Sequence, residues 1–77
     1  MIKIFISTPY IKLSQFLKFS GILTNGSGSK KFLETNNVMV DGISEKRRNR
    51  KLYVGSKVSV NNEDYLIDKI IEIKGEW

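Results

Sequence analysis

The sequence predicts one small α+β domain, in which a strand and two short helices precede a series of strands. Apolar residues recur at helical spacing over residues 13–20. After residue 37 they instead alternate at strand spacing, between turns that contain Gly or Asn. The chain has 77 residues, which allows a single domain over residues 1–77 with a thin core.

The N-terminal part is expected to form a strand and then a helix. Residues 2–6 read Ile-Lys-Ile-Phe-Ile and predict a short strand, which ends before Pro9 because the residue preceding proline avoids helical angles. A short amphipathic helix is predicted within residues 11–21, and Gly21 suits the position that closes it. Its inward face follows the i, i+3, i+4, i+7 rule at Leu13, Phe16, Leu17 and Ser20.

A second helix is expected over about residues 26–36. Asn25 would be its N-cap, and Phe32 and Leu33 would be its apolar anchors. Its start would offer free N–H groups to a phosphate. Residues 24–29, at the start of this helix, are rich in Gly and Ser. They do not fit a P-loop, because the Lys-Ser/Thr ending of that motif is missing.

The rest of the chain reads as strands separated by turns. Asp41-Gly42 is the strongest hairpin signal in the sequence, and Gly55-Ser56 and Asn61-Asn62 are further turns. The last apolar segment does not alternate cleanly, so it fits either one bent strand or two pieces. The predicted strands are residues 38–40 with a short return at 43–44, then 52–54, 58–60 and 65–73.

The composition excludes several classes of functional site. The chain has no Cys and no His. Disulfides, zinc sites, thiol nucleophiles and Ser-His-Asp triads are therefore excluded. No nucleophile, base and orienting residue can be named as a set among the other side chains. We therefore expect neither an enzyme nor a bound metal or other cofactor.

The same composition favours the cytoplasm. A small secreted domain usually needs disulfides, which this chain cannot form. No apolar run approaches the roughly 20 residues that cross a bilayer, and residues 2–6 are too short for the core of a signal peptide. We expect a cytoplasmic monomer with no membrane partner.

Positive charge is unevenly distributed along the chain. Residues 1–57 contain 11 Lys and Arg against 3 Asp and Glu, whereas residues 58–77 contain 2 against 5. Five cations fall within residues 46–51, and only Glu45 is close enough in sequence to pair with them. A basic body with an acidic end is typical of a protein that binds a polyanion with one face. The simpler alternative for this segment is a solvated loop.

The order of these features resembles the S4 RNA-binding domain family. The resemblance rests on these motifs in this order: Leu-x-x-Phe-Leu-Lys, a Gly, a capped second helix, Val-x-Val-Asp-Gly, and a Gly turn before Val-x-Val. The basic stretch of residues 46–55 is similar to the small stand-alone bacterial S4-domain proteins of the YaaA type. The resemblance covers about residues 11–67, with an added strand at each end. It implies an S4-like (alpha-L) fold, with two helices on an antiparallel sheet of about four to five strands.

The resemblance also implies which residues contact RNA. In the family, the helices and the turn after them form the RNA-contacting surface. Clustered Lys and Arg release counterions when they bind phosphates, and Arg adds bidentate hydrogen bonds. On the second helix, Lys30 matches a basic residue of the family, and its neighbour Lys31 is a weaker candidate for RNA contact. The matched positions are Lys12, Asn25, Lys30, Arg47, Arg48, Arg50 and Lys51.

Two departures from the family pattern fall near the basic stretch. The Gly of the family's Arg-Arg-Gly-Arg sequence is Asn49 here. The family's Gly-Asp is Gly55-Ser56, which removes an acid from that loop.

Tyr10 and Tyr53, like Phe19, fit either base stacking or packing, and their spacing favours packing.

Functions from different classes remain open. The first is a module that binds structured RNA, with ribosomal RNA and the ribosomal subunit as the leading candidates and ribosome assembly as the process. The second is a protein-interaction adaptor whose basic face meets an acidic partner. A DNA-binding accessory protein is a further possibility, because phosphate contacts alone do not separate RNA from DNA.

Overall fold

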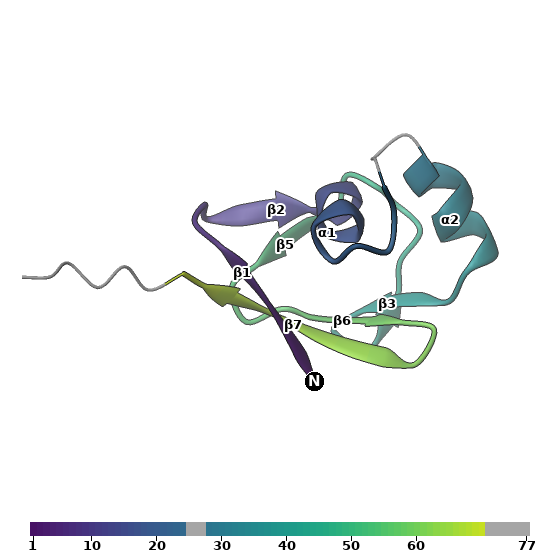
Figure 1. Cartoon of the computed structure of the whole chain (residues 1–77). Helices are drawn as coiled ribbons and strands as arrows, with labels where there is room; N and C mark the ends of the chain where they lie inside the picture. The colour runs from purple at the N-terminus through teal and green to yellow at the C-terminus, as the bar shows by residue number, and fades with distance from the viewer. Residues whose placement is uncertain (25–27, 71–77) are drawn as a thin grey trace, which may run out of the picture.

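The computed structural model describes residues 1–24 and 28–70, in which two helices and a two-stranded ribbon cover a five-stranded sheet (Figure 1). The sheet has the strand order β1 (Ile2–Ile6), β7 (Glu63–Lys69), β6 (Lys57–Val60), β3 (Val38–Val40) and β4 (Ile43–Ser44). The ribbon pairs β2 (Tyr10–Lys12) with β5 (Lys51–Tyr53). The helices are α1 (Leu13–Phe19) and α2 (Ser29–Thr35).

The α+β class is confirmed, but the sheet is mixed rather than antiparallel. β3 pairs antiparallel with β4, and β6 with β7, through short turns as predicted. β3 also pairs antiparallel with β6, although residues 41–56 lie between them. β1 lies parallel to β7, with Ile2 opposite Tyr65 and Ile6 opposite Lys69. Parallel neighbours need a long connection, and here almost the whole domain lies between the two strands.

The ribbon strand β2 is absent from the prediction, which assigned Ile11 and Lys12 to the first helix. These residues are extended because they pair with β5, and buried Ile11 lies opposite buried Leu52. Lys12 then becomes the extended residue before α1, and its N–H donates to Gln15 Oε1 at 2.9 Å. Gly21 has φ +80° at the end of α1, as its predicted closing role requires.

The second helix begins later than predicted. α2 is described from Ser29, with Gly28 at its N-cap, against a predicted helix over about residues 26–36 with Asn25 as the N-cap. Residues 25–27 lie outside the described part of the chain. Gly and Ser have weak helix propensity, which is consistent with the later start.

The core lies between the five-stranded sheet on one side and the helices and the ribbon on the other. α1 contributes Leu13, Phe16 and Leu17, all fully buried as predicted, and the ring of Phe16 meets Tyr65 of β7 edge to face at 5.2 Å. α2 adds Leu33. Within residues 1–24 and 28–70, the helices are too short and polar to cross a membrane.

The hairpin predictions are confirmed by backbone angles. Asp41 and Gly42 both have positive φ between β3 and β4, and Asn61 and Asn62 do the same between β6 and β7. Two consecutive positive φ values are the requirement of a tight hairpin whose twist matches its strands. These turns fix the strand register and therefore the direction in which the chain leaves β4 toward the basic residues.

Candidate nucleic-acid interface

Five predicted cations come together where α1 begins, and we call them the basic cluster: Lys12, Arg47, Arg48, Arg50 and Lys51. Backbone hydrogen bonds bring them together. The first amides of α1 donate to carbonyl groups of residues 46–50, which we call the basic loop. Leu13 N–H donates to Arg50 O at 2.8 Å, and Ser14 N–H donates to Arg48 O at 3.0 Å. Lys12 lies opposite Lys51 in the ribbon. The loop carbonyls thus cap the helix, and the helix fixes the loop.

The carboxylate of Glu45 lies beneath the cluster and is only 7 % exposed. Arg47 donates to it from Nε at 3.1 Å and Nη2 at 3.2 Å, and from its backbone N–H at 3.3 Å. Arg50 donates from Nη1 at 2.8 Å. One buried anion therefore holds two arginines of the cluster in fixed positions, since a buried charge needs such partners.

These contacts shift the pKa of both partners. The hydrogen bond from the Arg47 side chain is the main cause that lowers the pKa of Glu45 to about 2, against the opposing effect of burial. The backbone N–H of Arg47 and the side chain of Arg50 lower it further. The same contact raises the pKa of Arg47. Glu45 therefore stays ionised throughout the neutral range.

The two paired arginines keep most of their donors. Each guanidinium has five N–H groups. Arg47 uses two of them on Glu45 and Arg50 uses one, so most of these N–H groups make no other hydrogen bond that the described part of the chain shows. Their side chains are 76 % and 37 % exposed. The pairing orients the guanidinium groups and leaves them able to bind an anion.

The outer face of the ribbon carries two tyrosines and two lysines, and we call it the tyrosine–lysine face: Tyr10, Lys12, Lys51 and Tyr53. Side chains two residues apart on a strand share a face. The register places tyrosine beside tyrosine and lysine beside lysine. The ring centroids are 5.7 Å apart, and Lys51 Nζ lies 4.9 Å from the Tyr10 centroid, a cation–π contact.

The predicted residues of the second helix are placed differently. Lys30 and Lys31 are exposed on α2. A hydrogen bond joins α2 to the basic loop instead: Lys46 Nζ donates to Leu33 O at 3.1 Å. Such a cation stabilises the carbonyl end of a helix. Asn25 lies outside the described residues.

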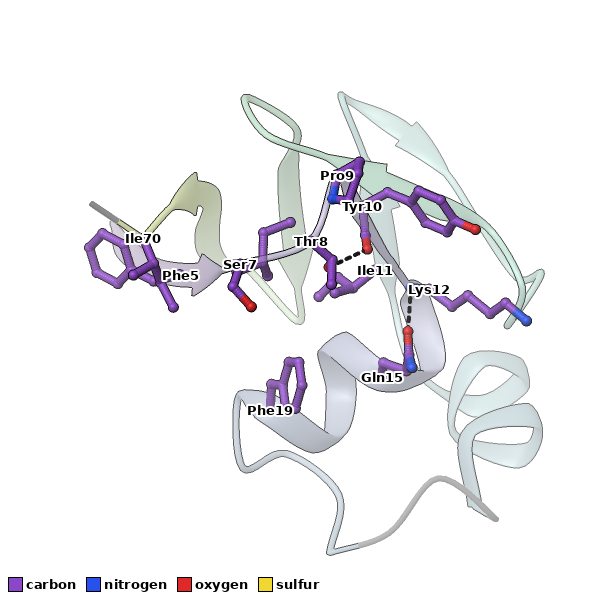
Figure 2. Close-up of a pocket in the computed structure, with 11 residues that line it drawn as sticks. Phe5, Ser7, Thr8, Pro9, Tyr10, Ile11, Lys12, Gln15, Phe19 and Ile70 are labelled. Atoms are coloured by element: carbon purple, nitrogen blue, oxygen red, sulfur yellow. Dashed lines mark hydrogen bonds between the residues drawn. The ribbon is translucent and has the colours of Figure 1, made fainter. Parts of the chain in front are cut away.

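Two hollows flank the ribbon, and the smaller is the charged one. It has a volume of about 460 Å³ and brings Arg47, Arg50, Lys51 and Tyr53 together. The larger, of about 610 Å³, is lined mainly by apolar residues (Figure 2). Figure 2 shows Tyr10 and Lys12 at one end of the larger hollow and Phe5, Phe19 and Ile70 at the other.

Two parts of this surface were not predicted from the sequence. From the sequence, Glu45 is only an acid next to the cations, although a single acid before five cations is a usable signal for an organising ion pair. The tyrosine–lysine face depends on β2, which pairs with residues far along the chain. Without that pairing, the side-by-side positions of Tyr10 and Tyr53 have no local signal.

Comparisons with known proteins agree on one family. The S4 domain matches residues 4–68, from within β1 to within β7. The chain is 42 % identical over 55 residues to the probable ribosome maturation protein RlbA of Bacillus subtilis (strain 168), covering 71 % of this chain and 78 % of that protein. A comparison with solved structures found no significant match. Because the domain match spans most of its length, the chain belongs to the S4 domain family.

Proposed function

We propose that this protein binds structured RNA through the basic cluster and acts in ribosome maturation, with ribosomal RNA as its target. The carrying observation is the meeting of Lys12, Arg47, Arg48, Arg50 and Lys51 at the start of α1. Membership of the S4 family and the likeness to a probable ribosome maturation protein support the same function. Ribosomal RNA as the target is also consistent with a cytoplasmic location.

The cluster has the chemistry that a folded RNA backbone requires. Phosphate contacts supply most of the affinity, and each neutralised phosphate releases condensed counterions. Folded RNA is recognised largely by its shape and backbone, which suits a small rigid surface. Glu45 supplies that rigidity, because Arg47 and Arg50 are held before RNA arrives. The activity we propose is binding, with no catalytic step.

Affinity for an RNA hairpin, measured against salt concentration, tests this function. The wild type should bind with a steep fall in log K as log salt rises. Replacing Arg47, Arg48 and Arg50 by Ala should lower affinity roughly 10- to 100-fold at about 0.1 M salt and reduce the slope by roughly two to three. Because Arg47 and Arg50 also hold the buried Glu45 carboxylate, urea denaturation must first show that the triple variant is folded. In the folded variant, the change in slope reports the lost phosphate contacts.

A second triple variant controls for net charge. Lys3, Lys18 and Lys69 are exposed cations outside the cluster. Changing them to Ala removes the same charge and should change affinity by less than about threefold. Equal losses in the two triple variants would mean that total charge, and not this cluster, attracts RNA.

Competition separates RNA from the other polyanions. Duplex DNA of the same sequence and polyglutamate should displace the RNA hairpin only at much higher concentrations. Displacement by DNA at equal concentration would favour a DNA-binding accessory protein. Displacement by polyglutamate at equal concentration would favour an adaptor for an acidic protein.

A further inference from the structure

We propose that the hollow beside Tyr53 binds an unpaired base of the RNA, which stacks on the Tyr53 ring while its phosphate meets Lys51 and Arg50. This inference rests on the proposed function and narrows it to RNA that presents an unpaired nucleotide next to a structured backbone. The hollow has a volume of about 460 Å³, within the range of about 300–1,000 Å³ typical of small-molecule sites.

The ring of Tyr53 is available for stacking. The residue is 52 % exposed, although it lies on the ribbon that covers the core. Tyr10 contacts it at a centroid distance of 5.7 Å and an interplanar angle of 49°, but Tyr10 does not line the hollow. Tyr53 thus lines the hollow and keeps about half of its surface exposed despite the contact with Tyr10, and bases stack on exposed aromatic rings whatever their sequence.

The backbone around Tyr53 is fixed. Its N–H donates to Ser56 Oγ at 3.2 Å, and Ser56 N–H donates back to Tyr53 O at 2.9 Å. The same turn is bound to β7, because Gly55 N–H donates to Ile67 O at 2.9 Å and Ile67 N–H donates to Ser56 O at 3.0 Å. A ring held in this way needs little ordering when a base stacks on it.

The lining of the hollow combines one carboxylate with several cations. Asp41 also lines it, and its Oδ1 accepts the Lys57 N–H at 2.9 Å. A carboxylate repels a phosphate but is compatible with a neutral base, because it can accept a hydrogen bond from the amino group of that base. Lys51 shares the outer face with Tyr53 about 6.6 Å along the strand, a distance comparable to that between a base and its own phosphate.

Among residues 1–24 and 28–70, the other exposed aromatic residues lack this combination. Phe5 and Phe19 are 54 % and 62 % exposed, but they line the larger, mainly apolar hollow on the other side of the ribbon (Figure 2). That hollow contains one cation, Lys12, among its lining side chains. Phe5 is therefore a matched control, an aromatic residue of similar exposure outside the proposed base site.

Two short RNA hairpins test the inference, one fully paired and one with a single bulged nucleotide. The wild type should bind the bulged hairpin roughly 5- to 150-fold more tightly, which is the contribution of one stacked base. Tyr53→Ala should abolish this preference. Tyr53→Phe should keep it, since the ring remains, and Phe5→Ala should also keep it.

A spectroscopic measurement on the wild type makes the test independent of how the variants fold. With a fluorescent aminopurine as the bulged base, emission should fall on binding because stacking quenches it. Equal affinity for the two hairpins, or unchanged emission on binding, would overturn the base site. If both hairpins bound equally with a steep salt dependence, RNA binding by the basic cluster would be supported and the base site would be rejected. If neither bound at low salt, both proposals would fail.

Discussion

The basic loop and the tip of the β6–β7 hairpin are both exposed and both charged, but different interactions hold them. The hairpin tip follows a regular antiparallel ladder, and its two positive φ values come from Asn61 and Asn62. Its acids, Glu63 and Asp64, are exposed. The basic loop has no such ladder over residues 46–50, and it is held by a buried carboxylate and by the first amides of α1.

This difference separates two ways of presenting charge. The hairpin's shape is set by backbone pairing, so its acidic side chains are interchangeable with other polar groups. In the loop, the ion pairs that place Arg47 and Arg50 are also part of what holds the loop. A charge change there should therefore alter structure and binding together, whereas one in the hairpin should alter neither strongly.

The largest expected effect is that of Glu45→Gln, which removes the anion beneath the cluster. The hydrogen bonds to a charged group are lost, so the free energy of unfolding should fall by roughly 2–3 kcal/mol in urea denaturation. RNA affinity should also fall, even though the net charge rises by one, because the arginines lose their orientation.

Glu63→Gln is the matched control in the hairpin. It changes the same chemical group at an exposed position, and its effect on stability should stay within about 0.5 kcal/mol. Tighter RNA binding by Glu45→Gln than by the wild type would show that Glu45 acts only as an unfavourable charge.

Acid should weaken the loop before it weakens the hairpin. The pKa of Glu45 is about 2 in the folded protein, below its ordinary value of 4.5. A lowered folded-state pKa contributes stability that is present above pH 4.5 and is lost as the pH falls toward 2.

The loss in the wild type should be on the order of 2 kcal/mol after discounting for the solvent exposure of the arginines. Urea denaturation at several pH values measures it. Glu45→Gln should lack this part of the pH dependence, and an unchanged pH profile in that variant would assign the acid sensitivity to other carboxylates.

A smaller effect is expected at the hairpin tip. Asn61 Oδ1 accepts the Asn37 N–H at 3.0 Å, and its Nδ2 donates to Asn36 Oδ1 at 2.9 Å, so it connects the tip to the end of α2. Asn61→Ala should lose about 1 kcal/mol more than Asn62→Ala, which has the same left-handed backbone without those two contacts. Thermal unfolding of the two variants measures the difference, and equal stabilities would show that only the turn conformation matters.

The smallest expected effect is that of Ser56→Asp, which restores the acid of the family pattern. The new carboxylate would line the charged hollow beside Tyr53. RNA affinity should fall by about 0.5 kcal/mol, or roughly twofold, because an exposed charge is largely screened. Ser7→Asp adds the same charge at an exposed site outside that hollow and should have less effect. A larger loss for Ser7→Asp would contradict the position of the binding surface.

Local patterns predicted most of the fold. The spacing of Leu13, Phe16 and Leu17 identified α1 because burial follows the helical period, and Asp41-Gly42 identified the first hairpin because that turn needs positive φ. The exceptions are non-local. β2 is extended only because β5 lies beside it, and β1 is parallel to β7 through pairing across the whole domain.

The site divides in the same way. The run of cations at 46–51 is visible in the sequence, and so is Lys12 once the family resemblance is applied. The orientation of Arg47 and Arg50 depends on how deeply Glu45 is buried, which no local pattern reports. The start of α2 was misplaced because Gly28 serves as its N-cap without any side-chain signal.

The parallel pairing of β1 with β7 also constrains when the domain can fold. The edge strand β1 is made before its partner β7, and the other described elements lie between them in the chain. During synthesis, β1 therefore emerges with no sheet to join, and it stays unpaired until β7 has left the ribosomal exit tunnel. Loop closure on this scale slows folding, because its entropic cost must be met before the long-range contacts form. The five-stranded sheet can therefore be completed only after β7 has been made, and a nascent chain stalled before β7 should not hold β1 in the sheet.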